Sequence, residues 1–199
     1  MQFSDLDLTK TYTYADYLKW TFDERLELIK GYIFKMSPAP AEFHQRISQK
    51  VNYALYNYFY NKPCEVYTAP FDVRLVKKTT TDGDITTVVQ PDICVICDPD
   101  KIDDRGCLGA PDIVVEILSP ADNRKELKNK YEVYEEAGVK EYWIIHPQEK
   151  TFFKYVLDGN EQFQPTKLLT FGDEVTSLLL PGFALNLDEV FADRFTKSN

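Results

Sequence analysis

Two segments near the middle of the chain place a carboxylate among apolar residues. Glu116 lies within APDIVVEILSP, and Asp92 opens the apolar part of QPDICVIC. A carboxylate is costly to bury unless a cation or a hydrogen-bond donor pairs with it. If the two segments are neighbouring strands, the carboxylates can share a divalent cation that prefers oxygen ligands, such as Mg²⁺ or Mn²⁺. The pair therefore predicts a site for a divalent cation.

The strand face of Glu116 bears on whether its carboxylate is buried. Side chains alternate along a strand, so Glu116 shares its face with Val114 and Leu118. These apolar neighbours favour a buried carboxylate, and the alternative is an edge strand on which Glu116 faces water. Asp92 taken alone is weaker evidence, because Pro-Asp commonly marks a turn.

A lysine lies on the apolar face of the helix predicted after Ser119. At about 100° per residue, Lys130 falls within a stripe formed by Leu127, Val133, Tyr134 and Ala137. Lys125 and Lys128 project to the opposite side. Since lysine is rarely buried unless paired, we predict that the Lys130 ammonium reaches the two carboxylates. The alternative is that Lys130 snorkels past its neighbours to solvent.

The elements before these segments can be predicted from turn signals and periodicity. A short helix is expected near Thr13–Lys19, and LELIKGYIFKMS predicts two strands around a Lys30-Gly31 turn. The region from Ala41 to Asn61 has helical periodicity. CEVYTAPFDVRLV predicts one extended strand, and KKTTTDGDITT predicts a polar loop with a turn at Asp82-Gly83.

The centre and the C-terminal part predict further strands and two helices. TVVQPDICVIC and APDIVVEIL are strands on either side of the acidic loop DPDKIDDRGCLG. Asp122 or Asn123 can cap a helix that runs to about Ala137 and stops at Gly138. EYWIIH is a strand, TFFKYVL and LLTFGDEVTSLLL form a meander, and a helix lies near Leu187–Phe195. We therefore predict an α/β fold: a mixed sheet flanked by helices, an extra β-hairpin and a C-terminal β-meander, in a single domain of residues 1–199.

The composition indicates a folded protein with an acidic surface. Among 199 residues 44% are hydrophobic and 28% charged, with a net charge of −9. This acidity argues against a protein that coats nucleic acid, and less against a nuclease that needs few phosphate contacts. No signal peptide or membrane span is evident, so we expect a cytoplasmic protein.

The four cysteines are few for this length, and we predict buried, reduced thiols. Cys94 and Cys97 form a CxxC, which can indicate zinc or redox chemistry. In a strand, however, positions three apart lie on opposite faces. We therefore favour core packing for this pair.

The arrangement of motifs resembles a known superfamily. Pro91-Asp92 followed by Glu116 on the next strand resembles the PD-(D/E)XK nucleases. PDIVVEILSP, then Lys130 and YEVYEEAGVKEYWIIHP, resembles the Uma family of predicted restriction endonucleases, as does LELIKGYIFKMSPAPAEFHQRI. The resemblance covers about Tyr12 to Phe191. It implies a restriction-endonuclease-like core.

The resemblance also implies roles for individual residues. Asp92 and Glu116 would bind Mg²⁺ or Mn²⁺, and Lys130 would orient the attacking water or stabilise charge on the phosphate. The superfamily's E-x-K pattern would place the lysine at position 118, where this chain has Leu118. The Uma family is similar in moving the lysine to the following helix, where Lys130 matches it.

Three further residues are candidates by the same resemblance or by position. Glu27 matches a family glutamate that would complete the metal shell, or it is a surface carboxylate of the hairpin. His44 matches a family histidine, or it is a core residue of its helix. Gln90 shares a strand face with Asp92 and could bind the nucleophile or bond its neighbours.

Two functions from different classes follow from these observations. The first is a metal-dependent endonuclease acting on DNA as a homodimer. The second is a catalytically silent nuclease-fold module that binds nucleic acid or a protein partner. The tyrosines and phenylalanine of the 41–61 helix could stack bases, but without interleaved basic residues they favour helix packing and a dimer contact; they are Tyr53, Tyr56, Tyr58, Phe59 and Tyr60.

Overall fold

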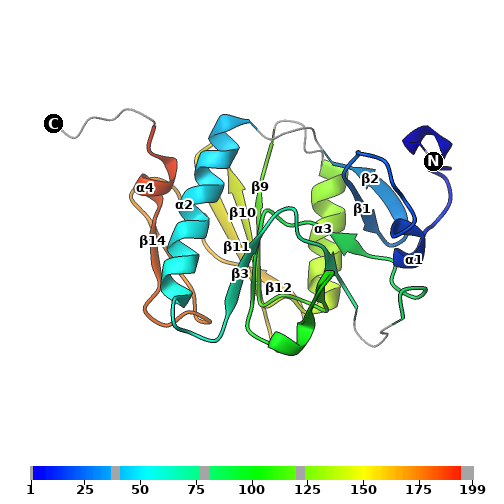
Figure 1. Cartoon of the computed structure of the whole chain (residues 1–199). Helices are drawn as coiled ribbons and strands as arrows, with labels where there is room; N and C mark the ends of the chain where they lie inside the picture. The colour runs from blue at the N-terminus through cyan, green and yellow to red at the C-terminus, as the bar shows by residue number, and fades with distance from the viewer. Residues whose placement is uncertain (1, 37–40, 77–80, 120–123, 194–199) are drawn as a thin grey trace.

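The chain folds into two mixed β-sheets with a helix packed between them (Figure 1). The computed structural model describes residues 2–36, 41–76, 81–119 and 124–193, without the side chains of 124–126. The predicted helix caps Asp122 and Asn123 lie outside the described residues. In the part of the chain that is described, no helix has the length and apolar character to cross a membrane.

The central sheet contains both segments that bear the candidate carboxylates. Its strands, in order, are β12 (Phe163–Pro165), β11 (Thr151–Leu157), β10 (Glu141–His146), β9 (Ile113–Ile117), β6 (Ile93–Ile96) and β3 (Glu65–Thr68). β9 and β10 run parallel and are joined by α3 (Arg124–Ala137), whereas β9 and β6 are antiparallel. β9 is therefore an interior strand, and the edge-strand alternative for Glu116 is wrong.

The N-terminal sheet lies on the other side of α3. Its strands, in order, are β2 (Tyr32–Lys35), β1 (Leu26–Ile29), β5 (Val88–Val89), β4 (Val73–Arg74), β8 (Gly106–Leu108) and β7 (Ile102–Asp103). The predicted β1–β2 hairpin is confirmed. Its turn needs glycine, because Gly31 has φ +83° and an added Cβ would lie 2.8 Å from the Thr11 Cβ.

Two predicted strands are each divided between the two sheets. CEVYTAPFDVRLV forms β3 and β4, and TVVQPDICVIC forms β5 and β6. Each break contains a proline, Pro70 or Pro91, and proline has no N–H to donate to a sheet ladder. The prediction of single strands was wrong because the apolar run continues from one sheet into the next.

The acidic loop predicted between the two central strands contains regular structure. It includes a 3₁₀ turn, η2 (Pro99–Lys101), and the β7–β8 hairpin.

Helix α2 (Glu42–Phe59) covers the outer face of the central sheet (Figure 1). Its buried stripe of Ile47, Val51, Leu55 and Phe59 packs on that sheet. The same core includes residues of the C-terminal elements β13 (Glu174–Thr176), β14 (Ala184–Asn186) and α4 (Leu187–Phe191). The predicted meander is divided instead: β11 pairs with β10 and β12 in the central sheet, whereas β13 and β14 form a separate two-stranded sheet, and an isolated bridge joins Phe152 to Leu169.

The N-terminal segment packs on the outer side of the N-terminal sheet. It contains the 3₁₀ turn η1 (Phe3–Asp5) and the short helix α1 (Tyr14–Tyr17). Tyr14 is buried with Leu28, Ile85 and Val88 in a small third core cluster.

The prediction of four reduced cysteines was wrong for two of them. Cys64 and Cys97 form a disulfide, whereas Cys94 and Cys107 are buried free thiols. Glu65 pairs with Ile96 across the β3–β6 ladder, so the residues just beyond this pair are adjacent. The sequence did not reveal this pairing, because it depends on which strands are neighbours. Cys94 and Cys97 do lie on opposite sides of the sheet, as predicted.

Candidate active site

Lys130 lies between two carboxylates that come from different sheets. Its Nζ is 3.0 Å from Glu116 Oε1 on β9 and 3.1 Å from Glu27 Oε1 on β1. Lys130 is only 6% exposed, so the alternative in which it snorkels to solvent is wrong. Lys128, on the opposite side of α3, is exposed. The helical-face prediction that Lys130 is the buried lysine of this helix is therefore confirmed.

Asp92 lies beside Glu116 across the β6–β9 ladder. Ile93 pairs with Val115 in this antiparallel register, which sets the preceding Asp92 opposite Glu116. Asp92 Oδ2 accepts a hydrogen bond of 2.7 Å from the backbone N–H of Ile117. Its carboxylate remains partly accessible, because 21% of the side chain is exposed.

His44 reaches the same carboxylate from α2. Its Nε2 is 3.3 Å from Asp92 Oδ2, and the residue is buried. The two alternatives for His44 are therefore compatible. It lies on the buried stripe of its helix, and it also contacts a carboxylate of the candidate site.

Glu27 and Gln90 join the two sheets at the site. Glu27 is 1% exposed, so its interpretation as a surface carboxylate of the hairpin is wrong. The backbone N–H of Gln90 donates to Glu27 Oε1 at 2.8 Å. Gln90 follows β5 of the N-terminal sheet, and two residues later Asp92 precedes β6 of the central sheet. The chain thus crosses between sheets through the site.

Two contacts in this region were not predicted from the sequence. Tyr134 donates its hydroxyl to Glu116 Oε1 at 2.7 Å. The spacing of four residues from Lys130 on one helix face could have indicated this partner. Gln90 Oε1 accepts from Arg25 Nε and Nη2, and Gln90 Nε2 donates to Asp72 Oδ1. No local pattern in the sequence predicts this second network.

The site has more negative than positive charge. The pKa of Glu116 is raised to about 8: burial raises it most, the neighbouring Asp92 and Glu27 carboxylates also raise it, and Lys130 and Tyr134 lower it. Burial also opposes the charged form of Lys130, but Glu116 and Glu27 outweigh it and hold the lysine pKa well above its ordinary value. The lysine therefore keeps its positive charge between Glu116 and Glu27, and Asp92 lies next to Glu116 across the β6–β9 ladder.

The donor types fit a hard divalent cation. Asp92 and Glu116 offer carboxylate oxygens, and the surplus negative charge would be offset by a 2+ ion. Within the described ranges, no three His, Cys, Asp or Glu side chains are grouped to hold a metal. Mg²⁺ does not require such a group, because it usually keeps several waters and binds one or two carboxylates together with substrate phosphates.

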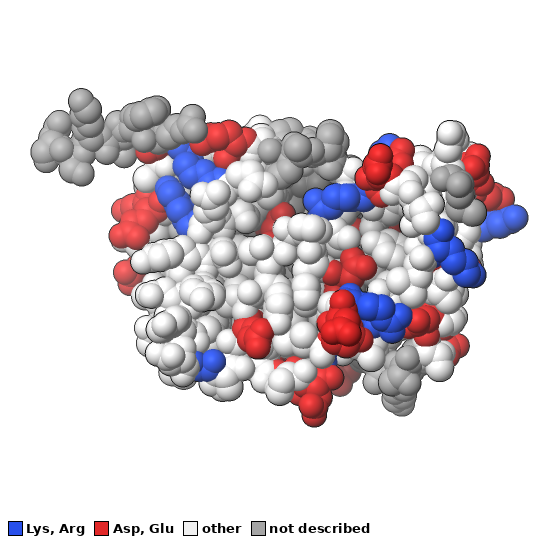
Figure 2. Space-filling model, viewed as in Figure 1, with Lys and Arg blue, Asp and Glu red and all other residues white. Residues whose placement is uncertain are grey.

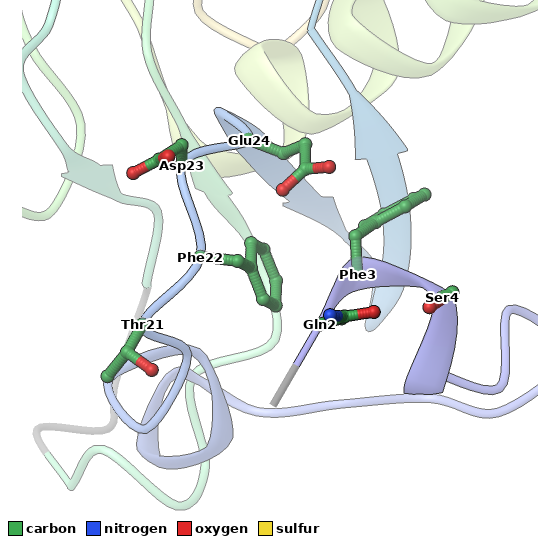
Figure 3. A pocket seen from close by; sticks show the side chains of 7 residues that line it. All are labelled: Gln2, Phe3, Ser4, Thr21, Phe22, Asp23 and Glu24. Atoms are coloured by element: carbon green, nitrogen blue, oxygen red, sulfur yellow. The ribbon is translucent and has the colours of Figure 1, made fainter.

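A separate pocket lies at the N-terminal end of the molecule (Figure 3). It is lined by Gln2, Phe3, Ser4, Thr21, Phe22, Asp23 and Glu24. None of these is a predicted site residue, and the Asp23 and Glu24 carboxylates disfavour a phosphate ligand. We therefore do not assign this pocket to the site.

The face shown in Figure 2 has no continuous basic band. Lys and Arg side chains are interspersed with Asp and Glu, and a broad uncharged area lies left of the centre. Non-specific nucleic-acid binding requires basic groups along the phosphate backbone. This face is therefore unsuited to binding nucleic acid through charge alone.

Comparison with known proteins identifies the family. The family model Uma2, described as "Putative restriction endonuclease", matches residues 14–188. The chain belongs to the Uma2 family. A crystal structure from Anabaena variabilis, described as a "putative nuclease belonging to DUF820", matches this Uma2 chain with a TM-score of 0.70 and 20% identity. The match covers 90% of this chain and 97% of that chain. No curated protein matches the chain.

The Uma2 assignment and the structural match confirm the predicted family and fold class. The mixed sheets with flanking helices are similar to the fold of that putative nuclease from Anabaena variabilis. In this Uma2 protein, Leu118, two residues after Glu116, packs against the core between the sheets. The Lys130 ammonium lies beside Glu116 instead.

Proposed function

We propose that this Uma2 protein is a metal-dependent endonuclease that hydrolyses phosphodiester bonds of DNA. The observation that supports this most directly is the buried Lys130 ammonium held between Glu116 and Glu27, next to Asp92. A buried charge cluster of this kind seldom stabilises a fold more than apolar residues of similar volume would, so stability alone does not explain its presence. Clustered groups with shifted pKa values are instead typical of functional sites.

Asp92 and Glu116 would hold Mg²⁺ or Mn²⁺, with Glu27 as a third carboxylate nearby. When bound, the ion polarises the phosphodiester and makes a water molecule more acidic. Tyr134 and the Ile117 N–H hold the Glu116 and Asp92 carboxylates through hydrogen bonds of 2.7 Å each. Such contacts orient the ligands before a cation arrives.

Lys130 would act through its positive charge. Because Glu116 and Glu27 keep its pKa well above the ordinary value, its Nζ retains the proton and is unsuited to serve as a general base. Its N–H groups can donate to the attacking water or to a phosphoryl oxygen that gains charge in the transition state.

A catalytically silent module is the second candidate. The observations that favour it are the net charge of −9 and the engagement of Lys130 by two carboxylates. Such a module would bind nucleic acid or a protein partner without cleaving a phosphodiester.

A plasmid-nicking assay with Mg²⁺ and Mn²⁺ distinguishes the two candidates. We expect nicking by the wild type and its loss in Asp92→Asn, because the amide cannot supply the same ligand charge. Lys130→Ala should lower the rate by about 10²-fold or more, as the loss of a transition-state donor does.

Matched controls separate these effects from a general change of charge. Asp104→Asn and Lys128→Ala alter exposed residues and should nick at the wild-type rate. Circular dichroism of each variant verifies folding. Absence of metal-dependent nicking by the wild type, or equal rates in all variants, would contradict the proposed nuclease activity.

A further inference from the structure

Arg25 differs from the other arginines in what holds its guanidinium. Arg46, Arg74 and Arg105 each lie within 4.0 Å of a carboxylate oxygen. Among the arginines whose side chains the structure describes, Arg25 alone has no carboxylate partner at that distance. It is exposed to solvent, directly before β1.

A neutral amide fixes the position of this cation. Gln90 Oε1 accepts from Arg25 Nε at 3.1 Å and from Nη2 at 2.6 Å. On its other side, Gln90 Nε2 donates to Asp72 Oδ1 at 2.8 Å, which orients the amide oxygen toward Arg25. A glutamate at position 90 would pair directly with the arginine, whereas glutamine positions the guanidinium without a carboxylate in contact with it, and Asp72, bonded to the other end of the same amide, interacts with Arg25 through charge only.

The position of Arg25 is next to the candidate active site. Arg25 precedes Glu27 by two residues, and Gln90 precedes Asp92 by two residues. The same Gln90 that accepts from Arg25 donates its backbone N–H to Glu27. Gln90 therefore contacts both the Arg25 guanidinium and the Glu27 carboxylate of the candidate site.

We propose that Arg25 binds a backbone phosphate of the nucleic acid, beside the phosphodiester held at Asp92 and Glu116. The proposal rests on the proposed nuclease function. Gln90 occupies Nε and Nη2, and no acceptor in the described parts of the chain binds Nη1. Guanidinium is suited to phosphate in both geometry and charge. An acidic chain needs such a contact to hold a polyanion near its carboxylates.

The test measures binding separately from cleavage. Fluorescence anisotropy of a labelled DNA duplex, with Ca²⁺ in place of Mg²⁺, gives Kd at several KCl concentrations. We expect Arg25→Gln to weaken binding about tenfold. The slope of log Kd against log salt should fall by about 0.9, the amount for one phosphate contact. Arg25→Lys should keep the slope but recover only part of the affinity, since lysine lacks the planar fork.

Arg105→Gln is the matched control. It removes the same charge from an exposed arginine that is already paired with Asp82, and it should leave the salt slope unchanged. A purely structural role of Arg25 would lower the thermal stability of both Arg25 variants and leave the slope at the wild-type value. That result would overturn the proposal.

The outcomes also separate this proposal from the nuclease function. If the wild type nicks plasmid and Arg25→Gln binds DNA like the wild type, only the phosphate role of Arg25 is overturned. If the wild type neither nicks nor binds DNA, the nuclease function fails and the role of Arg25 fails with it.

Discussion

At the scale of single residues, Glu116 gives the metal-free protein a pH-dependent stability. The pKa of its carboxyl is raised from 4.5 to about 8 in the folded protein, first by burial and then by Asp92 and Glu27. The folded state therefore binds the proton more tightly than the unfolded state does. The resulting stabilisation is complete below the unfolded value of 4.5 and is lost as the pH rises toward about 8.

We expect the unfolding free energy of the wild type in EDTA to fall across this window. The fall is at most about 1.4 kcal/mol per pH unit from this one group. Glu116→Gln cannot titrate, so its stability should vary less between these pH values. Urea unfolding at a series of pH values measures both profiles, and parallel profiles would contradict the raised pKa of Glu116.

The sequence predicted those residues of the candidate site that the faces of strands and helices reveal. Glu116 and Lys130 were identified because each charge interrupts an apolar face, a local property of β9 and α3. Tyr134 was placed on the correct helix face, but its bond to Glu116 was missed. Arg25 was not identified, because its partner Gln90 is 65 positions away and no periodic pattern links them.

At the scale of elements, a buried carboxylate connects the C-terminal segment to the central sheet. Glu141 begins β10 and is 0% exposed. Its Oε2 accepts from Trp143 Nε1 at 2.8 Å, and its Oε1 accepts from Ser177 Oγ at 2.7 Å. Ser177 follows β13, so this bond joins two elements that are far apart in the sequence.

Ser177→Ala should destabilise the protein by about 1–3 kcal/mol. The substitution leaves a buried carboxylate oxygen without its side-chain donor, and an unsatisfied buried group costs roughly this much. Urea unfolding measures the change. Ser48→Ala, a half-buried serine on α2, should change stability by no more than about 0.5 kcal/mol. Equal stability of the two variants would show that the Ser177–Glu141 bond contributes little.

The predicted elements were most accurate where one periodicity covers one element. The α2 stripe and the β1–β2 hairpin are such cases. The two predicted strands that contain Pro70 and Pro91 are each divided between the two sheets in the structure. An apolar run is compatible with a strand in either sheet, so the sequence pattern does not show to which sheet a residue belongs. Assignment to a sheet depends on contacts distant in sequence, such as Val73 with Cys107.

At the scale of the whole molecule, the predicted homodimer can be tested on the outer face of α2. Tyr53 and Tyr56 on α2 are exposed by 70% and 59%, and Tyr60, directly after the helix, by 66%. Apolar side chains of this size with high exposure are typical of interaction surfaces. Two copies that each have a charge of −9 repel least where they meet through uncharged groups.

We expect the wild type to sediment at the mass of two chains. The double variant Tyr56→Glu and Tyr60→Glu should sediment as one chain, because it introduces like charges at the contact. Glu161→Gln, at an exposed turn distant from α2 in the sequence, is the control and should remain dimeric. A wild type that sediments as one chain at all concentrations would contradict the prediction.

The crossing of the chain between sheets at Gln90–Asp92 also affects the order in which the site forms during folding. Lys130 and Glu116 are 14 positions apart, whereas Glu27 and the Gln90 amide are 63 apart. Closing the longer loop costs more chain entropy, so such contacts form later unless other contacts have already closed it. Lys130 and Glu116 can thus meet within the β9–α3 unit, but Glu27 joins them only after both sheets have docked. A nascent or partly folded chain lacks the complete cluster, so any activity that needs all of it is confined to the fully folded protein.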